Sequence, residues 1–183
     1  MKFKNRTELM RYINSLGFKT GAEIGVARGD NAEMMCREIP GIKLFCIDPW
    51  GVYRENKRGG NMDKHRANHA QTIERLKPYN VTIIQATSME AVETFNDEEL
   101  DFAYIDGNHD YKYVLEDIAE WSKKVKRGGI VSGHDYYQFN NSGIIEAVAE
   151  YLKDKPEIEL QLTDQNDDPD YDERHPSFWW IKP

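Results

Sequence analysis

A turn with two glycines constrains the fold of this chain more than any other feature of its sequence. Gly25 and Gly29 follow an apolar segment and precede Asp30, where a helical pattern begins. Because glycine has no Cβ, the backbone at these positions can take positive φ and come close to a ligand. The following helix presents unpaired N–H groups and the positive end of its dipole. This arrangement favours a small anionic or carboxylate-bearing ligand, and an ordinary strand-to-helix turn is the alternative.

The spacing of the two glycines argues against a dinucleotide. Gly25-x-x-x-Gly29 differs from the G-x-G-x-x-G pattern that accommodates a pyrophosphate, so NAD and FAD are not expected. With Glu23 before the turn and Asp48 at the end of the next apolar run, the pattern resembles class I S-adenosylmethionine-dependent methyltransferases. The resemblance implies that the glycines face the methionine part of the cofactor and that Asp48 faces the ribose hydroxyls. The alternative interpretation is structural: Glu23 would bind local backbone groups, and Asp48 would be part of the turn before Pro49.

Apolar segments of strand length alternate with amphipathic helical segments. Strands are expected at residues 20–26, 42–48, 81–85, 100–106, 130–133, 158–162 and 178–181. Helices are expected at residues 7–16, 31–39, 62–76, 88–95, 111–125 and 143–152. The alternation predicts one α/β domain over residues 1–183, and the resemblance implies that its fold is the Rossmann-like methyltransferase fold. Its sheet should be mainly parallel, with about seven strands and helices on both faces, and should bind ligands at the carboxyl ends of the strands.

Three segments are expected to stand apart from this alternation. Residues 1–19 should form an N-terminal helix, residues 50–78 a lid or surface helix insert, and residues 163–176 an acidic loop. His65 and His69 lie four residues apart in the insert, a spacing that can bind zinc. No third ligand accompanies them, which favours an exposed helix face.

Composition excludes several classes of protein. The chain has 183 residues, enough for one domain with a normal core, and no apolar run long enough to cross a bilayer. The formal net charge is −8, and an acidic segment at residues 154–173 argues against nucleic-acid binding. A basic start without an apolar run after it argues against a signal peptide. We expect a cytoplasmic protein with a small-molecule substrate and neither nucleic acid nor membrane as partner; a homodimer is one assembly to test.

Two apolar strands end in carboxylates, Asp106 and Asp135. If the strands are neighbours, both carboxylates lie at the edge of the sheet that holds the glycine turn. They would repel each other unless a cation or a proton lay between them, and Mg²⁺ prefers such oxygen ligands. His109, three residues beyond Asp106, is placed to take a proton from a substrate hydroxyl. The structural alternatives are helix caps for the two aspartates and a helix-start role for His109.

A narrower resemblance rests on the residues around these carboxylates. The pattern is similar to that of the macrolide-sugar O-methyltransferases, and its main matching residues are Asp106, Gly107, His109, Tyr111, Asp117, Trp121, Gly128, Gly129, His134, Asp135 and Tyr136. The resemblance implies that Asp106 and Asp135 hold a metal and that His109 is the base. Asn108 departs from it, because relatives often carry an acid there, and this puts in doubt any scheme with a second carboxylate beside Asp106. His134 is a candidate third ligand, although adjacent residues of a strand point to opposite faces.

These observations predict an S-adenosylmethionine-dependent methyltransferase that acts on a small-molecule hydroxyl, of sugar or phenol type, with Mg²⁺ assistance. The expected cofactor-binding residues are Glu23, Gly25, Ala27, Gly29, Asp48, Pro49, Trp50, Thr87, Ser88, Asp106 and Gly107. The expected catalytic residues are Asp106 and His109, and the expected metal ligands are Asp106, His134 and Asp135. Aromatic candidates for the substrate cleft are Trp50, Tyr53, Tyr136, Tyr137 and Phe139. The alternatives are a metal-independent N- or C-methyltransferase, a binding module without catalysis, and an α/β protein for another nucleoside.

Overall fold

Strands and helices alternate along the chain, as the sequence predicts. A computed structural model describes residues 2–51, 61–139, 142–165 and 175–183. Its strands are β1 (Thr20–Ile24), β2 (Lys43–Ile47), β3 (Val81–Ile84), β4 (Leu100–Ile105), β5 (Val125–Gly133), β6 (Gln161–Leu162) and β7 (Phe178–Ile181). Its helices are α1 (Arg6–Ser15), α2 (Asp30–Glu38), α3 (Met62–Leu76), α4 (Ser88–Val92), α5 (Tyr111–Lys124) and α6 (Ile144–Leu152).

The strands form one sheet in the order β3-β2-β1-β4-β5-β7-β6. Strands β1 to β5 pair in parallel, and β7 is antiparallel to both β5 and β6. The strand order reverses between β1 and β4, the position at which sheets of this kind bind ligands. The predicted mainly parallel sheet of seven strands is therefore confirmed.

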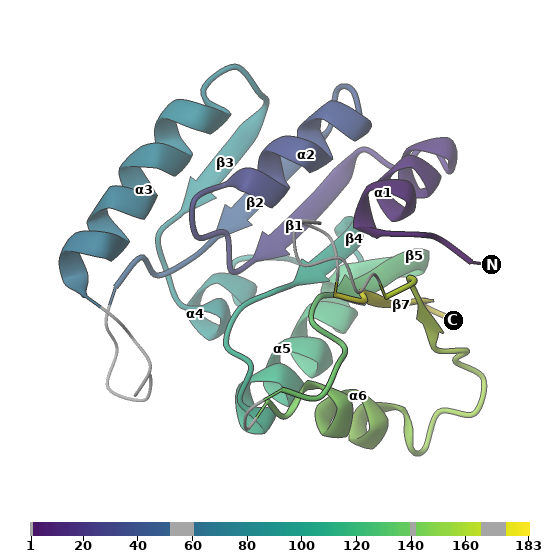
Figure 1. Cartoon of the computed structure of the whole chain (residues 1–183). Coiled ribbons are helices and arrows are strands. Elements are labelled where there is room, and N and C mark those ends of the chain that lie inside the picture. The colour runs from purple at the N-terminus through teal and green to yellow at the C-terminus, as the bar shows by residue number, and fades with distance from the viewer. Residues whose placement is uncertain (1, 52–60, 140–141, 166–174) are drawn as a thin grey trace.

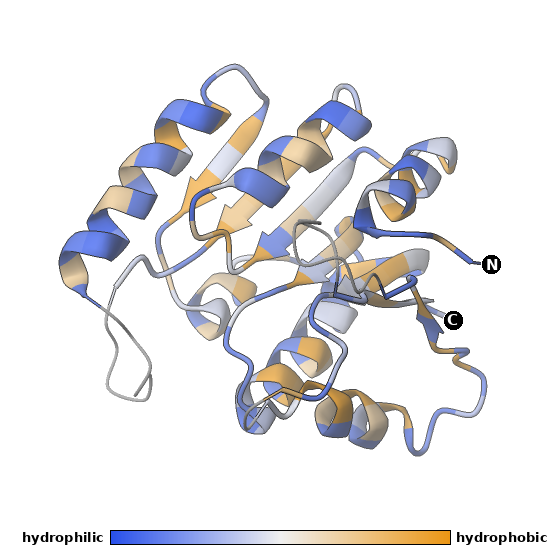
Figure 2. Ribbon diagram, viewed as in Figure 1, coloured by the Kyte–Doolittle hydropathy of each residue, from blue (hydrophilic) through white to orange (hydrophobic). Residues whose placement is uncertain are grey.

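Helices cover both faces of the sheet (Figure 1). One hydrophobic core lies between the sheet and the α1–α3 side, and a second lies between the sheet and the α4–α6 side. In Figure 2, hydrophobic residues dominate α6, whereas hydrophilic residues cover much of α3. Strands β2, β3, β4, β5 and β7 each supply side chains to both cores, because successive residues of a strand point to opposite faces.

Several element boundaries differ from the expectation, those of β5 and β6 among them. β5 begins at Val125, five residues before the expected start, and its pairing with β4 shifts register between Leu100 and Phe102. The expected strand at residues 158–162 is reduced to β6, because the amide of Ile158 donates to the carbonyl of Lys155 in a turn. Ile158 and Leu160 pack on the α4–α6 core without pairing in the sheet.

Of the three segments that were expected to stand apart, the structure describes the first almost completely and the other two only in part. α1 falls within residues 1–19, and α3 occupies much of the proposed insert at residues 50–78. Residues 52–60 of the insert and residues 166–174 of the acidic loop lie outside the described residues. In the described parts of the chain, no helix has both the length and the apolar character needed to span a bilayer.

Glu23 is an acid inside the core on the α1–α3 side. Its side chain is 1% exposed, and Oε1 accepts a hydrogen bond from Asn31 Nδ2 at 2.7 Å. Oε2 has no hydrogen-bond partner among the described residues. Burial raises the pKa of Glu23 from 4.5 to about 8, and the nearby carboxylates of Asp106 and Asp48 add to the increase. Glu23 is therefore mostly protonated at neutral pH.

Replacement of Glu23 by Gln should make the free energy of unfolding less dependent on pH. Between pH 4.5 and about 8 the folded chain keeps the Glu23 proton while the unfolded chain has lost it. Wild-type stability therefore falls with rising pH, by about 1.4 kcal/mol per unit for this group. Glu23→Gln lacks this contribution, so its stability relative to wild type should rise from pH 5 to pH 8 in urea unfolding.

A matched control is Glu74→Gln, which makes the same change on an exposed residue of α3. It should leave the pH dependence of stability as in wild type. If Glu23→Gln and wild type lost stability in parallel over this range, Glu23 would be ionised in the folded protein.

Candidate active site

The parallel strands end together at one edge of the sheet. Ile24 of β1 pairs with Ile47 of β2 and with Ile105 of β4, and Ile105 pairs with Gly133 of β5. The next residues along the four strands are Gly25, Asp48, Asp106 and His134. The register of the sheet therefore brings together residues that are up to 109 positions apart in the sequence, Gly25 and His134.

Gly25 lies where no side chain fits. Its φ is +91°, and a Cβ at this position would lie 2.2 Å from the carbonyl oxygen of Asp106. The β1 turn can therefore approach the end of β4 only because residue 25 is glycine. Two residues later, Ala27 also takes positive φ, at +51°, a conformation that is unfavourable for alanine.

The carboxylate of Asp48 holds this turn. Asp48 Oδ2 accepts hydrogen bonds from the amides of Val26 at 3.1 Å and Ala27 at 2.9 Å, and Oδ1 accepts from the amide of Trp50 at 2.7 Å. Oδ2 accepts two bonds, so Oδ1, which accepts one, keeps acceptor capacity for a ligand hydroxyl. Asp48 thus has the turn role that was the alternative for it, and it also faces the cavity described below.

Trp50 and α3 fix the same turn from its other side. Trp50 Nε1 donates to the carbonyl of Ala27 at 2.7 Å, and Thr72 Oγ1 donates to the same carbonyl at 2.9 Å. The Trp50 ring stacks on His69 of α3, with 4.4 Å between ring centroids. α3 is therefore more than the exposed surface helix that its charge suggests, because one of its faces packs on the glycine turn.

A cavity of about 420 Å³ opens at this edge of the sheet, within the usual size range of small-molecule sites. The predicted cofactor-binding residues that line it are Gly25, Ala27, Asp48, Pro49, Trp50, Thr87, Ser88, Asp106 and Gly107. The lining also includes residues that were not assigned to the cofactor: Ile24, Ile47, Gly51, His65, Asn68, Met89, Asn108, Tyr113, Glu116 and Asp117.

Two predicted cofactor-binding residues do not line the cavity. Glu23 points to the α1–α3 core, because it is one residue before Ile24, which points to the opposite core. Gly29 is the N-cap of α2 with φ +79°, and a Cβ there would lie 3.3 Å from Thr72 Cγ2. Both residues support the turn from outside the cavity, Glu23 through Asn31 of α2 and Gly29 through close packing on α3.

The β3 side of the cavity carries a hydrogen-bonded chain. Thr87 caps α4 in a capping box with Glu90. Ser88 Oγ donates to Asp117 Oδ1 and accepts from Trp121 Nε1 at 2.8 Å. Burial raises the pKa of Asp117 to about 7, although the Ser88 hydrogen bond lowers it. Sequence reasoning matched Asp117 to a motif but gave it no role.

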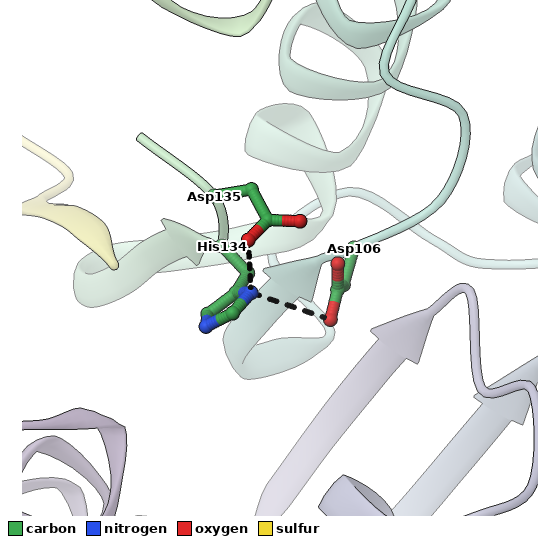
Figure 3. Close-up of side chains that lie close together, drawn as sticks. All are labelled: Asp106, His134 and Asp135. Carbon is green, nitrogen blue, oxygen red and sulfur yellow. Dashed lines mark ion pairs between the residues drawn. The ribbon is translucent and has the colours of Figure 1, made fainter. Parts of the chain in front are cut away.

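The predicted metal ligands do converge (Figure 3). Ligand atoms of Asp106, His134 and Asp135 all lie within 4.8 Å of one another, and this is the one such group of three or more among the residues that the structure describes. His134 Nδ1 is 3.0 Å from Asp135 Oδ1 and 4.0 Å from Asp106 Oδ2. Burial raises the pKa of Asp135, but the hydrogen bond from His134 and the neighbouring His109 and His175 outweigh it and lower the pKa overall.

The concern that His134 faces away from Asp135 is wrong. β5 ends at Gly133, so strand alternation does not extend to His134 and Asp135. The amide of His134 still donates to the carbonyl of Ile105 at 3.0 Å, and Asp135 then takes φ +55°. This turn brings the side chains of His134 and Asp135 to the same side.

His109 lies beside the two carboxylates. Its Nε2 is 3.7 Å from Asp106 Oδ1 and 3.6 Å from Asp135 Oδ2. Its ring meets that of Phe139 edge-on, with 5.6 Å between centroids. Asn108, one residue earlier, lines the cavity, and its Oδ1 accepts from the amide of Asp110 at 3.0 Å. Asn108 thus shapes the turn into α5, whereas an acid is common here in the family it resembles.

Aromatic rings continue from His109 along this edge. Tyr137 stacks on Phe139 at 4.6 Å and on His175 at 4.0 Å between centroids. Tyr136 instead contacts Phe178 of β7. Of the predicted cleft residues, Tyr137 and Phe139 therefore lie near the carboxylates, Trp50 belongs to the cavity, and Tyr53 lies outside the described residues.

A known family covers the segment that builds this site. Residues 22–136 match a family model described as a methyltransferase domain. The chain belongs to this methyltransferase family. The match includes the glycine turn, Asp48, Asp106 and the His134–Asp135 pair, and it confirms the resemblance to class I methyltransferases. The narrower resemblance to macrolide-sugar O-methyltransferases stays a prediction.

Solved structures of methyltransferases share the fold of this domain. The O-methyltransferase TomG of Streptomyces achromogenes, involved in tomaymycin synthesis and solved with S-adenosylmethionine, is 12% identical, with a TM-score of 0.70 over 97% of this chain and 80% of that chain. An O-methyltransferase of Bacillus cereus, solved with S-adenosylhomocysteine, is 14% identical, with a TM-score of 0.69 over the same shares of the two chains. At these identities the likeness establishes the fold alone.

A curated relative is the uncharacterized protein R132 of Acanthamoeba polyphaga mimivirus. It is 25% identical over 126 residues, which make up 66% of this chain and 52% of the relative. The methyltransferase chain thus spans about half the length of that relative.

Trp50→Phe should destabilise this methyltransferase domain by about 1 kcal/mol more than Trp179→Phe does. Both tryptophans are buried, at 2% and 3% exposure, so each change removes a similar volume. Only Trp50 loses a hydrogen bond, because Trp179 Nε1 has no partner among the described residues. Urea unfolding of both variants gives the difference. Equal losses of stability would mean that the Trp50 hydrogen bond does not hold the turn.

Proposed function

We propose that this chain is an S-adenosylmethionine-dependent O-methyltransferase that acts on a hydroxyl of a small molecule, of sugar or phenol type, with a divalent metal. One observation carries the proposal: Asp106 belongs both to the wall of the 420 Å³ cavity and to the group of potential metal ligands. A cofactor in the cavity and an acceptor at the carboxylates would therefore meet at Asp106.

The residues of the cavity suit the proposed cofactor. The open backbone at Gly25 and Ala27 would face the methionine part, and the acceptor capacity of Asp48 would face the ribose hydroxyls. Pro49, Met89 and Gly107 also line the cavity and would pack against the flat base. The positive φ of Ala27, Trp50 and Asp135 supports a built site, because strained backbone clusters where ligands bind.

The donor set also fits a divalent metal. Two carboxylates and one imidazole offer three ligand atoms on one side of the site, with the remaining positions left for water and substrate oxygen. Oxygen donors suit Mg²⁺ and Mn²⁺, and the His134 nitrogen strengthens the case for Mn²⁺ or another transition metal. We infer that Asp106, His134 and Asp135 would hold the ion.

The residues around the acceptor would complete the reaction. The cofactor supplies the methyl group, and a bound metal lowers the pKa of the acceptor hydroxyl. The cavity and the carboxylate edge would fix the acceptor oxygen in line with the methyl carbon, which accounts for much of the acceleration in such reactions. His109 Nε2 would take the hydroxyl proton, and Asp106 and Asp135 on either side of it would stabilise the resulting imidazolium.

Calorimetry with S-adenosylhomocysteine tests the proposed cofactor. Wild type should bind it, with NAD and ATP at least about tenfold weaker, and Gly25→Ala should weaken binding by roughly tenfold or more. Gly41→Ala is a matched control, because Gly41 has φ +78° but a Cβ there would meet nothing within 4 Å. Binding by Gly25→Ala that equals wild type would place the ligand away from this turn.

Manganese binding tests the proposed metal site independently of activity. Asp135→Asn should weaken Mn²⁺ binding at least about tenfold, measured from the electron paramagnetic resonance signal of the free ion. Asp97→Asn, at an exposed acid paired with Lys124, should bind as wild type does. His134→Gln should remove imidazole nitrogen coupling from the pulsed spectrum of bound Mn²⁺. No Mn²⁺ binding by wild type at millimolar concentration would instead support a metal-independent methyltransferase.

His109→Ala separates binding from chemistry. It should bind S-adenosylhomocysteine as wild type does, but methyl transfer to a panel of phenol and sugar acceptors should fall by about 10²–10⁴-fold. Undiminished turnover would leave His109 with a structural role at the start of α5. Binding without turnover by wild type across the panel would favour a binding module.

A further inference from the structure

Asp117 is a buried acid that the proposed methyl transfer does not use. It lies in the middle of α5, is 4% exposed, and lines the cavity close to Gly107. A carboxylate in such a position is costly unless hydrogen-bond donors satisfy it. The surrounding groups show which of its two carboxylate oxygens accepts a hydrogen bond within the protein.

Oδ1 of Asp117 has a donor that is itself fixed. Ser88 Oγ donates to Oδ1, and Trp121 Nε1 donates to Ser88 Oγ at 2.8 Å. A serine hydroxyl has one proton, so the Ser88 proton is already committed. Ser88 is a predicted cofactor-binding residue that lines the cavity, and these hydrogen bonds show that it also orients Asp117.

Oδ2 of Asp117 is the oxygen that remains for a ligand. It lies 3.7 Å from the position that a Cβ on Gly107 would occupy, and no hydrogen bond to it is found within the described parts of the chain. Burial raises the pKa of Asp117 to about 7, which is consistent with poor solvation. When Asp117 is ionised, Oδ2 can only accept, so the position then favours a ligand that brings an N–H group to it.

We propose that Asp117 Oδ2 accepts a hydrogen bond from the 6-amino group of the cofactor adenine, so that Asp117 selects an adenine nucleoside over other purines. The inference rests on the proposed function, because it needs the nucleoside in this cavity. An amino group offers the N–H that Oδ2 requires, whereas a carbonyl at the same position would place two acceptors together. Ser88 and Trp121 act as positioning residues that hold the carboxylate in the required orientation.

A merely structural Asp117 would behave differently. If its only role were to bridge α5 to Ser88, its replacement would weaken all ligands of the cavity by the same factor. If Asp117 recognises the base, its replacement should weaken binding only of ligands that carry the 6-amino group. Comparing the effect of the replacement on ligands with and without this group measures the coupling between the two.

The test is calorimetry with two ligands: S-adenosylhomocysteine and its purine analogue without the 6-amino group. Above about pH 8, where Asp117 is ionised, wild type should prefer the amino form by about tenfold or more, as expected for a hydrogen bond to a charged group. Asp117→Asn should reduce this preference to about twofold or less. Ser88→Ala, which removes the donor to Oδ1, should reduce it several-fold and serves as a second variant if Asp117→Asn does not fold. Glu120→Gln, also on α5 but outside the cavity lining, should keep the wild-type preference.

The outcomes separate this inference from the proposed function. Wild type that binds both ligands equally, or Asp117→Asn and Ser88→Ala that keep the wild-type preference, would overturn the role of Asp117 and leave the cofactor proposal standing. Wild type that binds neither ligand would overturn both.

Discussion

The common end of four parallel strands is the constraint on which the site depends. Because Ile24, Ile47, Ile105 and Gly133 share one register, the next residue of each strand lies at the same edge. A slip of one residue in any strand would move each of its side chains to the opposite face of the sheet. The residues of the site would then no longer lie together. The two cores on either side of the sheet hold this register, and so the packing of apolar side chains far from the cavity determines the geometry of the polar ones.

Acids at or near this edge are stabilised in different ways, which suits them to different roles. Asp48 is bonded to backbone amides and shapes the glycine turn. Asp117 is buried against a serine hydroxyl, and its pKa is raised to about 7. Asp106 and Asp135 lie beside histidines, and the pKa of Asp135 is lowered despite its burial. All four acids are aspartates, so their environments alone distinguish the structural role of Asp48 from the proposed recognition and metal-binding roles of the others.

Sequence patterns predicted the sheet and the strand-end residues, because strand and helix periods and glycine turns are local signals. Contacts between distant elements were not accessible in this way. The many charged residues of α3 gave no sign that Thr72 is buried, and Asp117 matched a motif to which the sequence could assign no role. Strand alternation suggested that His134 faces away from Asp135, but the strand ends at Gly133, so alternation does not apply to His134. The cytoplasmic location, the homodimer and the absence of a nucleic-acid partner stay predictions.

A crystal structure with S-adenosylhomocysteine and Mn²⁺ would show whether the ends of β1, β2, β4 and β5 gather around one nucleoside and one metal. We expect the nucleoside in the cavity between Asp48 and Asp117, with Mn²⁺ held by Asp106, His134 and Asp135. A nucleoside bound elsewhere, or a metal that does not touch Asp106, would contradict it.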